Sequence, residues 1–396
     1  MVLQMNKILF VDNDLHLLRS IKTGLNDQGD RWQLLFAESG AAALDLLEQT
    51  QVEVVVCNFQ MPEMSGLELL TLIENLYPQT LRVMLTGNPG KTKYSQTVNI
   101  CHYFFLKPLP LKGFKRFLKR AAEVLSLLDN EQLLATLNTV AALPIHPDTF
   151  SKLTSCLDHH DIQSQQLARI AGKDIALALQ IFKLSCSANF SRSRGFDSLE
   201  EALVYLDLGT IRSLLATQHL LFANDRDSCT NFKLNLLQRH SFQVMQLAET
   251  LTHLSGQQQR LNQVRLAALL HDAGRIVLAH TQPEAYREVF RRRDEQQLSS
   301  FTAAEVQVLG AGHAEVGAYL SALWGVPRCI VNAIRQHTQT HPPALHEAPI
   351  SHLVWHANRL AQGQLTALPD YAQDLLDEAK WQRFFEQFGN SIEARP

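Results

Sequence analysis

The sequence predicts a chain of two parts, a doubly wound α/β domain followed by an all-α domain. Up to about residue 125, short apolar runs alternate with amphipathic helical segments. Several runs are continuously apolar, which is typical of parallel strands that helices cover on both faces. From about Leu133 onward the apolar residues recur at helical spacing, with almost no strand pattern. The predicted parts are an α/β domain over 6–125, a helical linker over 126–134, a helical domain over 135–345 and a helical extension over 346–396.

The α/β part contains five predicted strands with helices between them, which makes a five-stranded parallel sheet. The strands are expected at Ile8–Val11, Gln33–Ala37, Val52–Cys57, Leu81–Thr86 and Tyr103–Leu106. The helices are expected at Leu15–Asn26, Ala41–Gln49 and Leu67–Leu76, and a longer one runs from Leu111 to Leu128. In a doubly wound sheet the functional site lies at the carboxyl ends of the strands, so the residues that follow each strand are the candidates.

Composition and charge argue against several classes of function. The formal net charge is −3, whereas a nucleic-acid-binding protein needs a concentrated basic field. The dense basic run Arg291–Arg293 is flanked by acidic residues, which is typical of a solvated helix face. No long apolar segment indicates a membrane span or an export signal. The six cysteines are scattered without a Cys-x-x-Cys pair, which favours reduced thiols in the cytoplasm.

The residues at the ends of the predicted strands form a set with a fixed order. Strand 1 ends in Val11-Asp12-Asn13-Asp14, strand 3 in Cys57-Asn58 four residues before Pro62, strand 4 in Thr86, and strand 5 in Lys107-Pro108. Over residues 6–125 this set resembles the response-regulator receiver family, which implies a flavodoxin-like fold. In that family an Asp at position 58 accepts the phosphoryl group and carboxylates at 12, 13 and 58 hold Mg²⁺, an ion that prefers anionic oxygens. Thr86 and Lys107 would hold the phosphoryl oxygens.

This chain departs from the receiver pattern at two of the three carboxylate positions, because Asn13 and Asn58 stand there. An amide cannot serve as the carboxylate nucleophile, so the resemblance predicts a receiver that is not phosphorylated. Thr86 and Lys107 then have a second interpretation as retained scaffold, in which Lys107 hydrogen-bonds Asn58 or pairs with Asp12. Asp14 is expected to cap the helix that follows it, and the Lys107-Pro108 bond is a candidate cis peptide.

The helical part carries a second ordered set, rich in histidine. Its members are His240, the pair His271-Asp272, His313, His337 and Asn358. With Ala142-Leu143-Pro144 and the helical segments around them, they resemble the HD superfamily of metal-dependent phosphohydrolases, and most closely its HDOD output domain. The resemblance implies a divalent Fe, Mn or Zn ion held by His240, His271, Asp272 and position 358, with His313 and His337 matching the additional ligands of two-metal HD-GYP phosphodiesterases. Imidazole and carboxylate donors together suit these ions.

The departures in this set weaken the case for catalysis. Position 358 is Asn where the family has Asp, Thr338 replaces a second histidine after His337, and the chain has no Gly-Tyr-Pro motif. A neutral amide oxygen is a poor substitute for a carboxylate in holding a cation. A buried His271-Asp272 pair that joins helices without a metal remains a competing interpretation.

These patterns together predict a signal-transduction protein of the two-component type. The first hypothesis is an adaptor, in which a non-phosphorylatable receiver is coupled to an HDOD domain that binds a partner or a ligand; no residue is then catalytic. The alternative is a metal-dependent phosphohydrolase or cyclic-dinucleotide phosphodiesterase. The expected partners are other signalling proteins and a nucleotide second messenger, without nucleic acid or membrane, and receiver resemblance also allows a homodimer.

Overall fold

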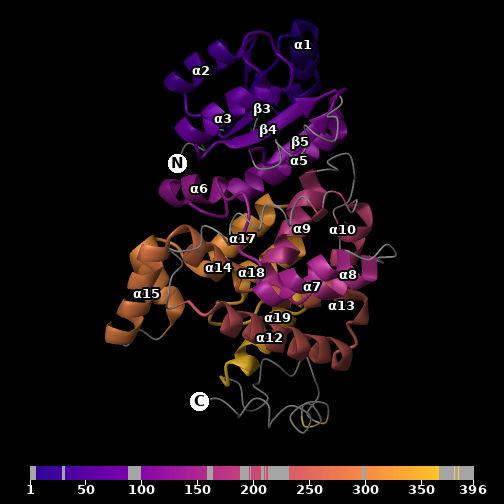
Figure 1. The fold of residues 1–396 in the computed structure, drawn as a ribbon, viewed down its shortest axis with the longest axis vertical. Helices are drawn as coiled ribbons and strands as arrows, with labels where there is room; N and C mark the ends of the chain where they lie inside the picture. The colour runs from indigo at the N-terminus through magenta and orange to yellow at the C-terminus, as the bar shows by residue number, and fades with distance from the viewer. Residues whose placement is uncertain are drawn as a thin grey trace. The chain divides into compact units, whose positions relative to one another are not determined.

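The computed structural model divides into two compact units (Figure 1), each described separately below. Unit 1 is Met1–Ala142 with Lys183–Gly195, and unit 2 is Leu143–Phe182 with Phe196–Pro396. The structure describes residues 6–28, 32–87, 100–157, 164–187, 196, 198–206, 209, 211–212, 232–296, 300–364, 379 and 382. Most of the predicted extension 346–396 beyond residue 364 therefore lies outside the described residues.

Unit 1 is built on a five-stranded parallel sheet, as the sequence predicts. Its strands are β1 (Asn6–Val11), β2 (Trp32–Ala37), β3 (Val54–Asn58), β4 (Leu81–Thr86) and β5 (Tyr103–Leu106). Their order in the sheet is β2-β1-β3-β4-β5, and all neighbouring pairs are parallel. Strands β3 and β4 are buried along their whole length, which explains their continuous apolar sequences. The order reverses next to β1, so the carboxyl ends of β1 and β3 lie at the switch point where such sheets bind ligands.

Helices cover both faces of this sheet (Figure 1), and they are α1 (Leu15–Gly24), α2 (Gly40–Gln49), α3 (Gly66–Leu76) and α5 (Leu111–Leu125), with a short 3-10 turn η1 (Asn26–Gln28) after α1. Helix α5 packs on β1 and β5 through aromatic rings. The Phe114 ring lies 5.6 Å from Phe10 and 5.1 Å from Phe105, and Phe117 lies 4.9 Å from Tyr103, centroid to centroid. Helix α2 contacts β1 and β2, and α3 contacts β3 and β4.

The long helix expected from Leu111 to Leu128 is shorter in the structure. Helix α5 ends at Leu125, with Ser126 as its C-cap, and a new helix, α6 (Glu131–Asn138), follows. The side chain of Asn130 accepts a hydrogen bond from the backbone N–H of Leu133, which caps α6. Because Asp and Asn hydrogen-bond the local backbone and favour caps over helix interiors, Asp129-Asn130 separates two helices.

All the described secondary-structure elements of unit 2 are helices. Its elements are α7 (Pro147–Leu157), α8 (Ser164–Ala171), the first part of α9 (Ile175–Ser187), α10 (Leu199–Tyr205), α12 (Leu234–Leu254), η3 (Gln258–Arg260), α13 (Leu261–Leu270), α14 (Ala273–Thr281), α15 (Pro283–Gln296), α16 (Phe301–Leu309), α17 (His313–Leu323), α18 (Arg328–Gln336) and α19 (Pro349–Ala361). Helices α12, α13, α18 and α19 pack on one another, and α17 packs on α14 and α18. This confirms the predicted all-α second part. None of the described helices combines the length and the apolar character needed to cross a membrane.

A glycine allows helices α14 and α17 to approach closely. A Cβ atom at Gly274 would lie 1.9 Å from the backbone oxygen of His313, so any larger residue there would push the two helices apart. The sequence His271-Asp272-Ala273-Gly274 thus places its glycine where backbone meets backbone. This contact fixes the start of α17 relative to the start of α14, the two helix ends that carry His313 and Asp272.

Candidate functional site

The five predicted receiver residues lie together at the carboxyl ends of the strands of unit 1. Asp12 follows β1, Asn58 ends β3, Thr86 ends β4 and Lys107 follows β5. The Nζ atom of Lys107 donates to Oδ2 of Asp12 at 2.6 Å. The predicted cis peptide at Lys107-Pro108 is present. Asp14 caps α1, because its Oδ1 accepts from the backbone N–H groups of the next turn.

The amide of Asn58 occupies the centre of this group. Its Nδ2 atom donates to Oδ1 of Asp12 at 3.2 Å, to Oδ1 of Asn13 at 3.2 Å and to the backbone oxygen of Gln60 at 2.6 Å. A hydrogen-bond donor therefore faces the oxygens that would otherwise coordinate a cation. Asp12 is the single carboxylate among the three predicted ligand positions, and Lys107 already neutralises it.

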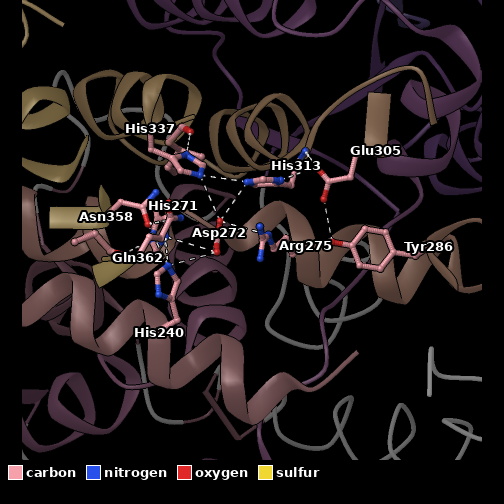
Figure 2. A network of polar contacts seen from close by, with 12 residues as sticks. His240, His271, Asp272, Arg275, Tyr286, Glu305, His313, His337, Asn358 and Gln362 are labelled. Atoms are coloured by element: carbon pink, nitrogen blue, oxygen red, sulfur yellow. Dashed lines mark hydrogen bonds and ion pairs between the residues drawn. The ribbon is translucent and has the colours of Figure 1, made fainter. Parts of the chain in front are cut away.

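In unit 2 the structure brings together all six predicted residues of the second set (Figure 2). They come from helix ends and helix faces: His240 from α12, the pair His271-Asp272 from the junction of α13 and α14, His313 from the start of α17, His337 from the end of α18 and Asn358 from α19. All but His240 are buried. Asp272 is the single charged residue in the segment 269–274, and its carboxylate is surrounded by imidazole rings and by Arg275.

Asp272 links two groups of histidines. Its Oδ1 atom lies 3.3 Å from Nε2 of His313 and 3.3 Å from Nε2 of His337. Its Oδ2 atom lies 3.6 Å from Nε2 of His271 and 4.0 Å from Nε2 of His240. Figure 2 shows the carboxylate between the two groups. Each oxygen of one carboxylate thus faces its own pair of imidazoles.

Hydrogen bonds at the far side of the rings set the histidine tautomers. Nδ1 of His271 lies 2.7 Å from the backbone oxygen of Ala268, and Nδ1 of His337 lies 2.6 Å from that of Ile334. A carbonyl oxygen only accepts, so both Nδ1 atoms carry the proton. Burial lowers the pKa of His271 to about 4 and also lowers that of His337. Both rings are therefore neutral at pH 7, with the Nε2 lone pair directed at the centre of the cluster.

These donor atoms fit a metal ion. Ligands about 2.0–2.2 Å from a common ion lie roughly 3.0–3.5 Å from each other in tetrahedral or octahedral sites. The Nε2 atoms of His240 and His271 are 3.4 Å apart, and those of His313 and His337 are 3.2 Å apart. Two sets of three donors, His240-His271-Asp272 and Asp272-His313-His337, each lie within 4.8 Å of one another. The Nδ1 hydrogen bonds are the contacts that commonly orient metal-binding imidazoles.

Asn358 lies at the edge of the first set and contributes no charge. Its Oδ1 atom lies 3.1 Å from Nε2 of His240, and the same oxygen accepts from Nε2 of Gln362 at 3.1 Å. The side-chain oxygen faces the cluster, as the resemblance implies for this position. The amide leaves Asp272 as the single carboxylate of both donor sets.

Two charged residues that the sequence did not single out contact the cluster. The first is Glu305. The fully buried carboxylate of Glu305 lies 2.6 Å from Nδ1 of His313 and accepts from the backbone N–H of His313 at 2.8 Å and from Tyr286 Oη at 3.0 Å. Burial alone lowers the pKa of His313, but the charge of Glu305 outweighs it and raises the pKa to about 9. The available signal was that Glu305 is the single charged residue in the segment Phe301–Leu309.

Arg275 is the second missed residue, and it controls the charge of Asp272. Its Nε atom lies 3.6 Å from Oδ1 of Asp272. Burial alone would raise the pKa of Asp272, but the charge of Arg275 outweighs it and holds this pKa well below its usual range. Asp272 is therefore ionised throughout the physiological range.

The cluster forms part of the wall of a cavity of about 1770 Å³ in unit 2. Six of the described lining residues are cationic, and they are Lys152, Lys173, Arg239, Arg275, Arg293 and Arg359. Two are carboxylates, Asp148 and Asp272. This excess is local, because the whole chain has a net charge of −3. A hollow with one sign of charge attracts ligands of the opposite sign.

Comparison with known proteins agrees with both parts of the fold. The family model of the HDOD domain matches residues 143–340, and that of the response regulator receiver domain matches residues 8–116. A chemotaxis protein CheY homolog of Campylobacter jejuni is 37% identical over 90 residues, covering 22% of this chain and 68% of that protein. An uncharacterized protein of Treponema pallidum is 23% identical over 210 residues, covering 53% of this chain but only 40% of that protein.

A solved structure shows the same fold over a larger part of the chain. The MmoQ response regulator of Methylococcus capsulatus has a TM-score of 0.51 and 21% identity, and the match covers 61% of this chain and 97% of that one. The HDOD model accounts for half of the sequence and the receiver model for a separate N-terminal segment. The chain thus belongs to the HDOD family and, with its response regulator receiver domain, is a signal-transduction protein.

Proposed function

We propose that this chain is a signalling adaptor whose receiver is not phosphorylated and whose HDOD domain binds a phosphate-bearing ligand without hydrolysing it. One observation carries the proposal. In both units an asparagine amide stands where the resemblance implies a carboxylate, and in both it hydrogen-bonds the residues beside it. Asn58 and Asn358 keep each site assembled while they remove the charge on which its chemistry depends.

In the receiver the amide removes both the nucleophile and a Mg²⁺ ligand. Phosphotransfer to a receiver requires an attacking carboxylate oxygen and a hard cation held by anionic oxygens. Asp12 supplies one negative charge, which the ion pair with Lys107 compensates. The N–H groups of Asn58 point at the remaining oxygens. The receiver therefore serves as a surface for other signalling proteins, independent of a phosphoryl signal.

In the HDOD domain the charge of the donor set suits one Fe, Mn or Zn ion better than two. His240, His271, Asp272 and Asn358 would hold the first ion, and His313 with His337 would complete a second site. A bound ion of this kind polarises a phosphoryl oxygen and lowers the pKa of a bound water. Two divalent ions would bring four positive charges to a cluster in which Asp272 is the single carboxylate ligand, with Arg275 beside it. This charge balance favours binding over turnover.

The cavity sets the class of ligand. Its volume of about 1770 Å³ exceeds the range of about 300–1,000 Å³ that is usual for small-molecule sites. Its six cationic side chains favour several negative charges on the ligand. A nucleotide second messenger with more than one phosphate meets both conditions.

Two measurements on the full chain test the proposal. Incubation with acetyl phosphate and Mg²⁺ is expected to leave the intact mass unchanged, and a phosphoryl adduct would contradict the receiver half. Cyclic di-GMP is expected to bind, by calorimetry, without turnover in the presence of Mn²⁺ or Fe²⁺. Robust hydrolysis that Asp272→Ala abolishes would instead establish the phosphodiesterase alternative.

A further inference from the structure

The three arginines Arg291–Arg293 of helix α15 do not share one environment. Arg291 pairs with Glu288 at 2.7 Å and also with Glu295, and Arg292 pairs with Glu288 at 2.8 Å. These two residues agree with the sequence-based interpretation. Arg293 does not appear in any ion pair between described residues, and it lines the cavity of unit 2. It is the member of the run whose charge the described part of the chain leaves uncompensated.

Arg293 is held against an aromatic ring that it shares with a second arginine. Its guanidinium carbon lies 4.1 Å from the centroid of the Phe301 ring, and that of Arg275 lies 4.8 Å from the same centroid. The two guanidinium carbons are therefore at most about 9 Å apart. Phe301 is itself fixed by an edge-to-face contact with Phe290, at 5.2 Å and 80°. Stacking on a fixed ring restricts both arginine side chains before any ligand arrives.

Two restrained guanidinium groups of like charge make a site for an anion. Each guanidinium presents N–H donors in a fork that matches two oxygens of a phosphate. Asp272 already compensates the charge of Arg275, so an anion that accepts from both groups would mainly compensate the charge of Arg293. Arg275, Arg293 and Phe301 all line the same cavity as Asp272 and His313. Arg275 lies beside Asp272 (Figure 2) and also contacts the Phe301 ring, so the arginine pair adjoins the histidine cluster.

We infer that Arg293 and Arg275, stacked on Phe301, form a phosphate subsite beside the histidine cluster. The ligand class is a molecule with at least two phosphate groups, one at this subsite and one at the cluster. This inference rests on the proposed function in one respect, that the cavity binds an anionic ligand. It names the residues that recognise the second phosphate, and it does not require a metal ion at the cluster.

The test uses inorganic pyrophosphate and the full chain in buffer with EDTA, so that the arginine pair is measured without a metal ion. Calorimetry is expected to detect binding to the wild type and about 10- to 100-fold weaker binding to Arg293→Gln, the usual effect of losing a hydrogen bond to a charged group. Arg291→Gln is the matched control. It removes the same charge two residues away on the same helix, from an exposed position, and is expected to bind like the wild type.

Three outcomes would overturn the inference: no pyrophosphate binding to the wild type, equal weakening by Arg293→Gln and Arg291→Gln, or no weakening by Arg293→Gln. Arg293 is exposed, so its replacement leaves the fold intact, and thermal unfolding checks this. A parallel titration with cyclic di-GMP separates the two proposals. If cyclic di-GMP binds the wild type and Arg293→Gln equally well, the subsite is contradicted and the proposed function is supported. If pyrophosphate binding depends on Arg293 but cyclic di-GMP does not bind, the subsite is supported and the cyclic dinucleotide is excluded as the ligand.

Discussion

Replacement of Glu305 by Gln in the metal-free protein is expected to cost about 3 kcal/mol of stability near pH 6 and progressively less toward pH 10. The carboxylate of Glu305 is fully buried. It accepts hydrogen bonds from the backbone N–H and Nδ1 of His313 and from the hydroxyl of Tyr286. Gln keeps the volume and one acceptor oxygen. The substitution therefore removes mainly the negative charge that faces His313.

The size of the effect follows from the pKa of His313. Glu305 raises this pKa to about 9 in the folded protein, against about 6.5 in an unfolded chain. Each pKa unit corresponds to about 1.4 kcal/mol, so the protonated imidazole contributes on the order of 3 kcal/mol. Because the folded pKa is the higher one, the contribution is complete below about pH 6.5 and is lost as the pH rises through about 9.

The assay is denaturant unfolding of both proteins in EDTA at intervals from pH 6 to pH 10. Glu284→Gln is the matched control, because Glu284 pairs with Arg287 at an exposed position on α15. Exposed pairs contribute about 0–1 kcal/mol, and no histidine titration is linked to this one. A difference between the wild type and Glu305→Gln that stays constant over the range would refute the charge pairing between Glu305 and His313. A variant that is more stable than the wild type at pH 6 would do the same.

Three further predictions concern unit 2, where His356 is a second buried histidine on α19, outside the cluster. Gly274→Ala is expected to destabilise unit 2 by about 3 kcal/mol or more in denaturant unfolding, because its Cβ would lie 1.9 Å from a backbone oxygen of α17; a loss below about 1 kcal/mol would contradict the close approach. His271 and His356 have pKa values lowered to about 4 by burial. The stability that their neutral forms contribute is present above about pH 6.5 and falls by about 5 kcal/mol between pH 8 and pH 4.5, whereas protonation of His313 adds about 2 kcal/mol over the same range, so metal-free protein should lose about 3 kcal/mol through these three groups; equal unfolding free energies at the two pH values would rule this out. After reconstitution with Mn²⁺ or Zn²⁺, elemental analysis should find metal in the wild type and none in His271→Ala. Asn358→Asp should retain the metal about tenfold more tightly than the wild type. A wild-type metal content in His271→Ala would place the ion elsewhere.

The fold of unit 1 was predictable because each element carries its own signal. All five strands begin and end within two residues of the predicted bounds, since continuous apolar runs and the polar residues that end them are local features. The end of α5 differs from the predicted one for the opposite reason. Leu128 continues the apolar periodicity and is buried, but Asn130 starts a new helix by capping it. Periodicity alone does not distinguish one long helix from two that bury the same face.

The histidine cluster was predictable only as a set of residues in order. The motif strings indicate which side chains belong together, and the structure places all six in one cluster. They do not indicate which oxygen of Asp272 faces which imidazole, because that depends on how the ends of α13, α14, α17 and α18 converge. Glu305 enters the cluster from α16 through a tertiary contact with His313, whereas Arg275 reaches Asp272 from the first turn of α14 through an i, i+3 contact. A residue that acts through tertiary contacts leaves no periodic pattern in its own segment.

The arginines of α15 show the same limit at the scale of three residues. Successive side chains on an α-helix point about 100° apart, so a run of three spans about 200° and its members do not share one environment. Arg291 and Arg292 lie within reach of Glu288 through the i, i+3 and i, i+4 spacings. Arg293 turns toward the cavity and Phe301 instead. The acidic residues of α15 pair with Arg291 and Arg292. The position of Arg293 depends on Phe301 of the neighbouring helix α16. A charge that remains uncompensated on its own helix is then the one available to a ligand.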